Sequence, residues 1–313
     1  MQKMYKYPIK VVSQMTGLSV FVIRAWEKRY DAVVPSRTET NRRLYSDEDI
    51  EKLKLLNEAI KKGHNIGSVA GLTINELQSV LGSNLKNQTS NQNVLYDLPA
   101  DSKLIIDECI DTIKSYDGTG LEKILLKASS KMSQPHLIEN LIIPLVYKIG
   151  DMWQDGQLRV GNEHLSTAVI RSFLSGLIER HIPAKNAPIF ISATPTNQEH
   201  ELGAMIAGVV AASAGWKVVY LGSNLPVEEI VAAAGSLDAK IVALSIVYPN
   251  DDPHLKKNLV NLKKMLPEEA AIIIGGRAVN GYLDVLDEIS AVVVKDTYQL
   301  KTELEAIRNN KYN

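Results

Sequence analysis

The stretch Ile189 to Gly203, IFISATPTNQEHELG, decides the fold of the larger part of this chain. It begins as an apolar strand, and the small residues from Ala204 to Ala214 predict a helix after it. Strands rich in Val, Ile and Ala that alternate with helices are typical of a parallel sheet covered on both faces. The strands expected are Ile189–Ala193, Lys217–Leu221, Ile241–Val247, Ala271–Ile274 and Ala291–Val294. Residues 187–313 therefore predict an α/β doubly wound, flavodoxin-like domain with a five-stranded parallel sheet.

Polar or unusually small residues follow several of these strands. His200 comes after the first strand, at the edge where open α/β sheets bind ligands. A neutral imidazole can ligate a metal, and Gly203 lets a bulky flat ligand approach the backbone. Ser245 lies near the end of the third strand, and Gly275-Gly276 follows the fourth. The position of His200 therefore predicts a ligand site at this edge, where the imidazole could ligate a metal.

Residues 99–183 show helical periodicity only. Four segments of this length favour an antiparallel four-helix bundle. Gly156 and Gly161 interrupt the pattern, so Trp153 is expected to end one helix and Glu163-His164 to begin the next, near each other in space. The four segments are Asp101–Ser115, Gly118–Ser130, Gln134–Trp153 and Asn162–His181.

The N-terminal residues 1–81 predict a winged helix-turn-helix, and the polar residues 82–98 a linker. A short helix from Val11 to Met15 and a turn precede a second helix, capped by Ser19, that ends at Tyr30. Val33 to Tyr45 reads as a wing, and Ser46-Asp47-Glu48-Asp49 opens a third helix as a capping box. The chain is thus expected to be multidomain.

Charge is distributed unevenly, although the net charge is −1. Residues 1–64 hold 13 Lys and Arg against 8 Asp and Glu, which leaves 22 of the 35 basic and 28 of the 36 acidic residues for the rest. A basic end suits contacts with phosphates of double-stranded DNA. The residues expected to contact DNA are Ser19, Arg24, Trp26, Lys28 and Arg29 on the second helix and Arg42, Arg43 and Tyr45 on the wing.

Other features exclude several classes of protein. The single cysteine, Cys109, excludes an internal disulfide and a multi-cysteine zinc site. No apolar run is long enough for a membrane helix and no signal peptide is visible, so a cytoplasmic protein without membrane contact is expected. The sequence has no P-loop, no G-x-S-x-G and no metalloprotease pattern, which favours a regulator over an enzyme.

Two regions resemble known families. Residues 6–77, with VFVIRAWEKRY at 20–30 and NRRLYS at 41–46, resemble the MerR family of transcription regulators. The pattern of His200, Ser245 and Gly275-Gly276 resembles the cobalamin-binding domains, whose loop reads D-x-H-x-x-G. That resemblance implies that His200 is the lower axial ligand of cobalt and that the serine and glycines hold the displaced nucleotide tail. The family's acidic residue is Gln198 here, whose amide oxygen could accept the imidazole's hydrogen bond but adds no charge.

A third resemblance involves Trp153, which is followed after nine residues by Glu163-His164. This spacing resembles the W-x9-E-H motif of the CarH/CarA/LitR light-sensing regulators. The resemblance implies that these three side chains cover the upper face of adenosylcobalamin. It also implies a repressor that binds its operator as a cofactor-assembled dimer or tetramer and is released by light. In CarH-type proteins a histidine follows the tryptophan, but here Gln154 does, and a neutral amide is a poor cobalt ligand.

Three alternatives stay open. The same fold could sense cobalamin without a response to light, and Gln154 is the reason to keep this reading. The site could instead hold haem, with His200 as an iron ligand. The C-terminal two-thirds also resemble corrinoid carriers of methyltransferases, but a carrier has no use for a DNA-reading helix.

Overall fold

The structure is a computed structural model that describes residues 5–18, 20–38, 42–61, 66–82, 98–249 and 252–309. It forms two compact units, one of residues 1–117 and 143–165 and one of residues 118–142 and 166–313. The predicted cap Ser19 and most of the predicted linker, residues 83–97, lie outside the described residues. The predicted domain boundaries therefore stay a prediction.

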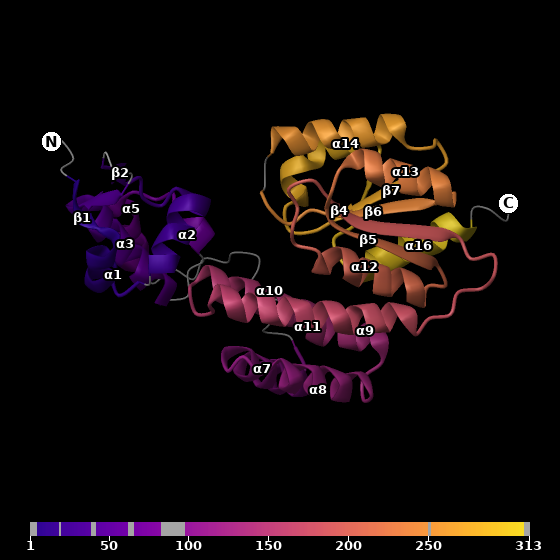
Figure 1. Cartoon of the computed structure of the whole chain (residues 1–313), viewed down its shortest axis with the longest axis horizontal. Helices are drawn as coiled ribbons and strands as arrows, with labels where there is room; N and C mark the ends of the chain where they lie inside the picture. Colours follow the sequence, from indigo (N-terminus) through magenta and orange to yellow (C-terminus); the bar gives the residue numbers. More distant parts are fainter. Residues whose placement is uncertain are drawn as a thin grey trace. The chain divides into compact units, whose positions relative to one another are not determined.

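The first unit begins with a small three-stranded antiparallel sheet in the order β1-β3-β2 (Figure 1). β2 and β3 form the predicted wing. β1 was not predicted, because a four-residue strand becomes visible only through its distant partner β3. The elements are β1 (Tyr5–Pro8), α1 (Ile9–Thr16), α2 (Val20–Tyr30), β2 (Ser36–Arg37), β3 (Arg43–Ser46), α3 (Asp47–Lys61), α4 (Ile66–Val69) and α5 (Ile74–Gly82).

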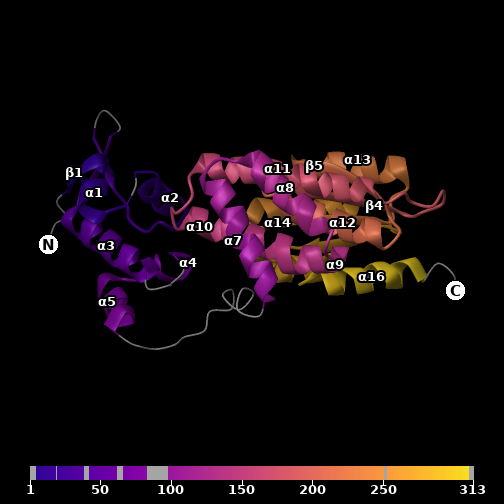
Figure 2. The ribbon, with the colours of Figure 1, turned by 90° about the horizontal axis from the view of Figure 1, so that it is seen from below.

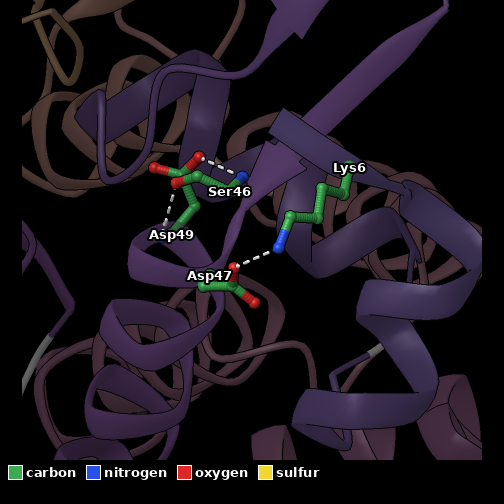
Figure 3. A network of polar contacts seen from close by, with 4 residues as sticks. All are labelled: Lys6, Ser46, Asp47 and Asp49. Atoms are coloured by element: carbon green, nitrogen blue, oxygen red, sulfur yellow. Dashed lines mark hydrogen bonds and ion pairs between the residues drawn. The ribbon is translucent and has the colours of Figure 1, made fainter. Parts of the chain in front are cut away.

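The start of α3 is a reciprocal capping box, as predicted (Figure 3). The backbone N–H of Asp49 donates to Oγ of Ser46 over 3.1 Å, and the N–H of Ser46 donates to Oδ2 of Asp49 over 2.9 Å. Two of the unpaired donors at the helix start are thereby satisfied. Nζ of Lys6 lies 3.1 Å from Oδ2 of Asp47, which ties β1 to the same helix end.

The helical region contains the four segments expected from the sequence. The third is one continuous run in which α9 passes through a π-helical turn into α10. Within the first unit, α7 packs against α10. The elements are α7 (Ala100–Lys114), α8 (Gly118–Ser129), α9 (Gln134–Leu137), η1 (Ile138–Ile142), α10 (Ile143–Gln154) and α11 (Val160–Glu179).

The second unit contains the predicted parallel sheet, with strand order β5-β4-β6-β7-β8. This is the flavodoxin-like order, in which the chain reverses its direction of winding between β4 and β6. The strands are β4 (Ile189–Pro195), β5 (Lys217–Leu225), β6 (Ile241–Ser245), β7 (Ala271–Gly275) and β8 (Val292–Val293). The helices are α12 (Leu202–Ser213), α13 (Val227–Leu237), α14 (Pro253–Met265), η2 (Val279–Tyr282), α15 (Leu283–Glu288) and α16 (Thr297–Asn309).

Helices cover both faces of this sheet, as the apolar strands predicted (Figures 1 and 2). α12 packs against α16 on one face, and α13 packs against α14 on the other. Alternate residues of one strand enter the two cores: Phe190 joins the α12 side, whereas Ile191 joins the α13 side. Among the described helices, none combines the length and apolar character needed to cross a membrane.

We expect Ser46→Ala to lower the free energy of unfolding of the N-terminal module by about 1 kcal/mol, because the N–H of Asp49 loses its acceptor. Hydrogen exchange of the α3 amides in the full chain measures this loss. Ser129→Ala, at the end of α8, removes a hydroxyl that caps no helix start and is the matched control. Equal protection of α3 in the two variants would contradict the prediction.

Candidate functional site

The carboxyl edge of the parallel sheet carries the predicted ligand-binding residues of the second unit. His200 is exposed in the loop between β4 and α12, and Ser245 ends the neighbouring strand β6. Gly275 ends β7 and is the register partner of Ser245. The winding reverses between β4 and β6, and open α/β sheets commonly bind ligands at such a point. The sheet therefore brings these residues to one edge, as predicted.

The hydroxyl of Ser245 is the most unusual polar group at this edge. Its Oγ is buried and has no hydrogen-bond partner among the described residues. A Cβ added at Gly203 would lie 2.4 Å from that Oγ, so any side chain at position 203 would collide with the hydroxyl. A buried hydroxyl without a partner is costly and fits a hydrogen bond from a ligand. The Ser245 hydroxyl is thus available to a polar ligand atom, and the close packing against it requires glycine at position 203.

The turn after β7 requires glycine. Gly276 has φ of +115°, and a Cβ there would lie 2.2 Å from the carbonyl oxygen of Ile246. At Gly275 the nearest atom to a Cβ would be Cγ2 of Val294 at 3.2 Å. The two glycines keep this backbone close to β6 and β8 and leave no side chain at the edge.

Gln198 is buried and its side chain is fully engaged. Its Nε2 donates to the carbonyl oxygen of Tyr248 over 2.6 Å. Its Oε1 accepts from the backbone N–H groups of Val247 and Tyr248 at 3.0 and 3.3 Å. Both lone pairs of Oε1 are thus used by the loop after β6, instead of by the imidazole as expected from the sequence.

Sequence reasoning missed three polar residues around the His200 loop. The hydroxyl of Tyr220 on β5 donates to Oε2 of Glu201, and Nη1 of Arg171 on α11 lies 3.4 Å from Oε1. Burial and the neighbouring Glu201 raise the pKa of Tyr220. The signal available in the sequence was a glutamate directly after the histidine, but nothing in a linear pattern pairs it with residues 171 and 220.

In the first unit, Trp153 lies in the last turn of α10 and Glu163-His164 in the first turn of α11, as predicted. Nε2 of His164 lies 3.5 Å from Oε2 of Glu163, and the His164 side chain is largely exposed. The end of α10 is in contact with α2. The guanidinium of Arg29 lies over the half-buried Trp153 ring, 3.6 Å from its centroid. The indole Nε1 of Trp26 also donates to the carbonyl oxygen of Gln154 over 3.1 Å. The helix predicted to read DNA therefore contacts the Trp153 segment.

The predicted DNA-contacting side chains separate into two groups. Arg24, Lys28 and Arg42 are exposed, where a phosphate or a base edge could reach them. Nε of Arg43 instead donates to both carboxylate oxygens of Glu27, at 2.7 and 2.8 Å, which holds the wing on α2. The hydrogen bond that Arg43 donates to Glu27 raises the pKa of Arg43 above its ordinary value.

Trp26 and Tyr45 require a correction. Both are fully buried in the core of the N-terminal module, and the Tyr45 hydroxyl donates to Glu27 over 3.1 Å. Burial and the adjacent Glu27 raise the pKa of Tyr45. Aromatic rings at these positions contribute large apolar area to a small core, so in this fold they support the reading surface without forming part of it.

Comparison with known families agrees with this arrangement. Residues 7–84 match the family described as MerR HTH family regulatory protein. Residues 188–296 match the B12 binding domain, and residues 105–177 match a second B12 binding domain family. The chain is a MerR-type regulator with B12-binding domains.

Two curated relatives match this MerR-type regulator over nearly its whole length. It is 25% identical to the HTH-type transcriptional repressor CarH of Myxococcus xanthus over 92% of this chain and 94% of that protein. It is 23% identical to the repressor CarA of the same organism over 96% and 97%. Because these relatives are transcriptional repressors, the chain is a regulator rather than an enzyme, as predicted.

A solved structure supports the fold of the B12-binding part of the regulator. The monomethylamine corrinoid protein of Methanosarcina barkeri superposes with a TM-score of 0.52 at 16% identity, covering 66% of this chain and 99% of that one. Its likeness confirms a helical region joined to a flavodoxin-like sheet as the fold of this part of the chain.

We expect Gly276→Ala to unfold the second unit of the regulator at lower denaturant, because its φ and the 2.2 Å approach to Ile246 both exclude a Cβ. The loss should exceed about 2 kcal/mol. Gly235→Ala on α13 is the matched control: nothing lies within 4 Å of its added Cβ, so helix propensity predicts a gain approaching 1 kcal/mol. Urea unfolding measures both, and equal stabilities would contradict the assignment of a strained turn.

Asp155, two residues after Trp153, makes stability depend on pH. Burial, helped by Asp151, raises the pKa of Asp155 to about 6. The folded chain therefore holds this proton more tightly than the unfolded chain, and stability falls as pH rises from about 4 to about 6. Asp155→Asn should raise the free energy of unfolding at pH 7 on the order of 1 kcal/mol after solvent screening, and not at pH 4.

Urea unfolding of the full chain at pH 4 and pH 7 measures this effect. Glu122→Gln, an exposed position on α8, changes the net charge equally and serves as the control. A stabilisation by Asp155→Asn that is the same at both pH values would contradict the role of burial.

Proposed function

We propose that this regulator is a cobalamin-dependent transcriptional repressor that binds its operator in the dark as an adenosylcobalamin-assembled oligomer and leaves it on illumination. The observation that carries the proposal is the buried, unpartnered hydroxyl of Ser245 beside Gly203, on the edge that also bears the His200 loop. The resemblance of the chain to CarH and CarA over nearly its whole length supports the proposed role as a transcriptional repressor.

The residues of the sheet edge suit the lower side of such a cofactor. In this proposal His200 holds the cobalt, and Ser245 donates or accepts a hydrogen bond with the nucleotide tail. Gly203, Gly275 and Gly276 let the backbone at this edge pack closely, because a Cβ at these positions would meet Ser245, Val294 and Ile246. The corrin would bring its own nitrogen ligands, so one imidazole from the protein would be sufficient.

The helical region would cover the other side. We propose that Trp153, Glu163 and His164 form this cover. Adenosylcobalamin supplies a cobalt–carbon bond that light breaks. The Trp153 indole would exclude water from that side. The guanidinium of Arg29 on α2 lies 3.6 Å from the centroid of this ring, so a movement of the indole would change that contact. That contact supports a path from the cofactor to the DNA-reading helix.

The N-terminal module would read DNA with its exposed cations. Arg24 and Lys28 lie on α2 and Arg42 precedes the wing strand β3, so helix and wing could both contact the phosphates of one operator half-site. Several modules joined in an oligomer bind an operator more tightly than one module does, because the later contacts are intramolecular. Self-association would therefore control repression.

A second candidate function is a regulator that senses cobalamin as a chemical signal, with no response to light. Gln154 favours it, since an amide replaces the histidine that follows the tryptophan in light-sensing relatives. The backbone carbonyl of Gln154 is also bound by Trp26, which ties this residue to the DNA-reading module. Haem remains the alternative cofactor for His200.

The test combines spectra with gel filtration of the full chain. We expect adenosylcobalamin added in the dark to shift the elution to an oligomer and to raise operator affinity, and illumination to reverse both. His200→Ala should weaken cofactor binding by about 10-fold or more, whereas His254→Ala, at the start of α14, should not.

The outcomes separate the candidates. If illumination of the protein loaded with adenosylcobalamin does not change its elution volume, the second candidate, a cobalamin sensor without a response to light, is favoured. Binding of haem but of no cobalamin would assign the other cofactor. Failure to bind any corrinoid, or equal affinity of His200→Ala and the wild type, would contradict the proposed function.

A further inference from the structure

We infer that Glu201 holds His200 in position for its ligand from the carboxyl side of the loop, in addition to the anchor that Gln198 provides on the amino side. The inference rests on the proposed function, because it assumes that His200 is a ligand, and it identifies how this chain supports that imidazole. Its basis is the hydrogen bonding on the two sides of the loop that carries His200.

On one side, Gln198 has no remaining capacity at its amide oxygen. Oε1 accepts two backbone N–H groups, from Val247 and Tyr248, and Nε2 donates to the carbonyl of Tyr248. This arrangement selects an amide, because a carboxylate in its place would bring a second oxygen to within about 2.6 Å of the Tyr248 carbonyl. The departure from the family's acidic residue thus has a structural reason: position 198 clamps the loop after β6.

The backbone of Gln198 is also held from β5. Its carbonyl oxygen accepts the N–H of Asn224 at 3.2 Å and the hydroxyl of Thr194. The N–H of Asn197 donates to Oδ1 of Asn224 over 2.8 Å. The start of the loop is therefore fastened to both neighbouring strands and cannot adjust independently of the sheet.

On the other side, Glu201 follows His200 directly and opens α12. Its carboxylate side chain is only 13% exposed and accepts the Tyr220 hydroxyl from β5 and Nη1 of Arg171 from α11. The Tyr220 bond is the stronger element, because Arg171 is 55% exposed and water weakens its ion pair. The backbone carbonyl of Glu201 accepts the N–H of Met205 at 3.2 Å, which continues the anchor into the helix.

These two anchors leave only Glu199 and His200 between fixed positions. With Gln198 and Glu201 both held, the Cα of His200 keeps its place at the sheet edge without help from a ligand. An ordered loop loses less conformational entropy on binding, so affinity improves without a further contact. Glu201 acts here as a positioning residue, through the backbone that it shares with His200.

The experiment measures adenosylcobalamin binding to the full chain in the dark by absorption titration. We expect Glu201→Ala and Tyr220→Phe to weaken affinity by about 10- to 100-fold, the usual effect of losing an outer-shell support. Glu201→Gln keeps an oxygen for the Tyr220 hydroxyl and should recover to within about fivefold of the wild type. Glu199→Ala removes an equal charge from the exposed neighbour and should stay within about twofold, because Glu199 belongs to neither anchor.

A second readout needs no cofactor. Hydrogen exchange of the amides at 199–201 should quicken at least about tenfold in Glu201→Ala and Tyr220→Phe, while the amides of β6 and β7 keep their protection. A purely structural role would instead loosen the sheet as well. Tyr220→Phe removes a single hydroxyl. If Glu201→Ala does not fold, affinity and exchange in Tyr220→Phe still test the inference.

Three results would overturn the inference. They are unchanged affinity and exchange in Tyr220→Phe, a loss in Glu199→Ala as large as in Glu201→Ala, and no recovery in Glu201→Gln. If the wild type binds no adenosylcobalamin, the proposed function fails, and the exchange data alone then decide whether Glu201 orders the loop.

Discussion

The reversal of winding between β4 and β6 is the constraint on which the ligand site depends. The chain leaves β4 and passes through α12 on one face of the sheet, whereas the connections after β5 and β6 use the other face. Open α/β sheets commonly bind ligands at such a point, and His200 and Ser245 lie there. The same strands are apolar on both faces, so the polar groups at this edge are conspicuous.

Hydrogen-bond satisfaction distinguishes the polar residues of that edge. Gln198 and Glu201 are buried or nearly so, and each has partners that hold the His200 loop in place. Ser245 is buried too, but its hydroxyl has no partner among the described residues. A satisfied group supports structure, whereas an unsatisfied one carries a free-energy cost that a ligand can relieve. This contrast is why Ser245 is the residue proposed to bind a ligand, whereas Gln198 and Glu201 are proposed to support the loop.

Burial makes the corresponding distinction in the N-terminal module. Trp26 and Tyr45 have the chemistry of nucleic-acid contacts, yet both lie in the core, and Glu27 joins Tyr45 to Arg43. Arg24, Lys28 and Arg42 remain at the surface. Arg29 stacks on Trp153, so one cation of the reading helix is shared with a residue of the helical region. The exposed residues among those predicted to contact DNA are therefore fewer than the sequence suggested, and they are cationic.

The sequence by itself determined the five strands of the parallel sheet, most of the helices, the capping box at Ser46 and the placement of His200 and Ser245 at one sheet edge. These features follow from periodicity, turn residues and the parallel order of strands, which act over short stretches of chain. Only the tertiary structure decided the partners of Gln198, the pairing of Glu201 with Tyr220 and Arg171, the strand β1 and the burial of Trp26. Each of these features depends on contacts between residues that are far apart in the sequence. A local sequence pattern does not specify which of these residues will be in contact after folding.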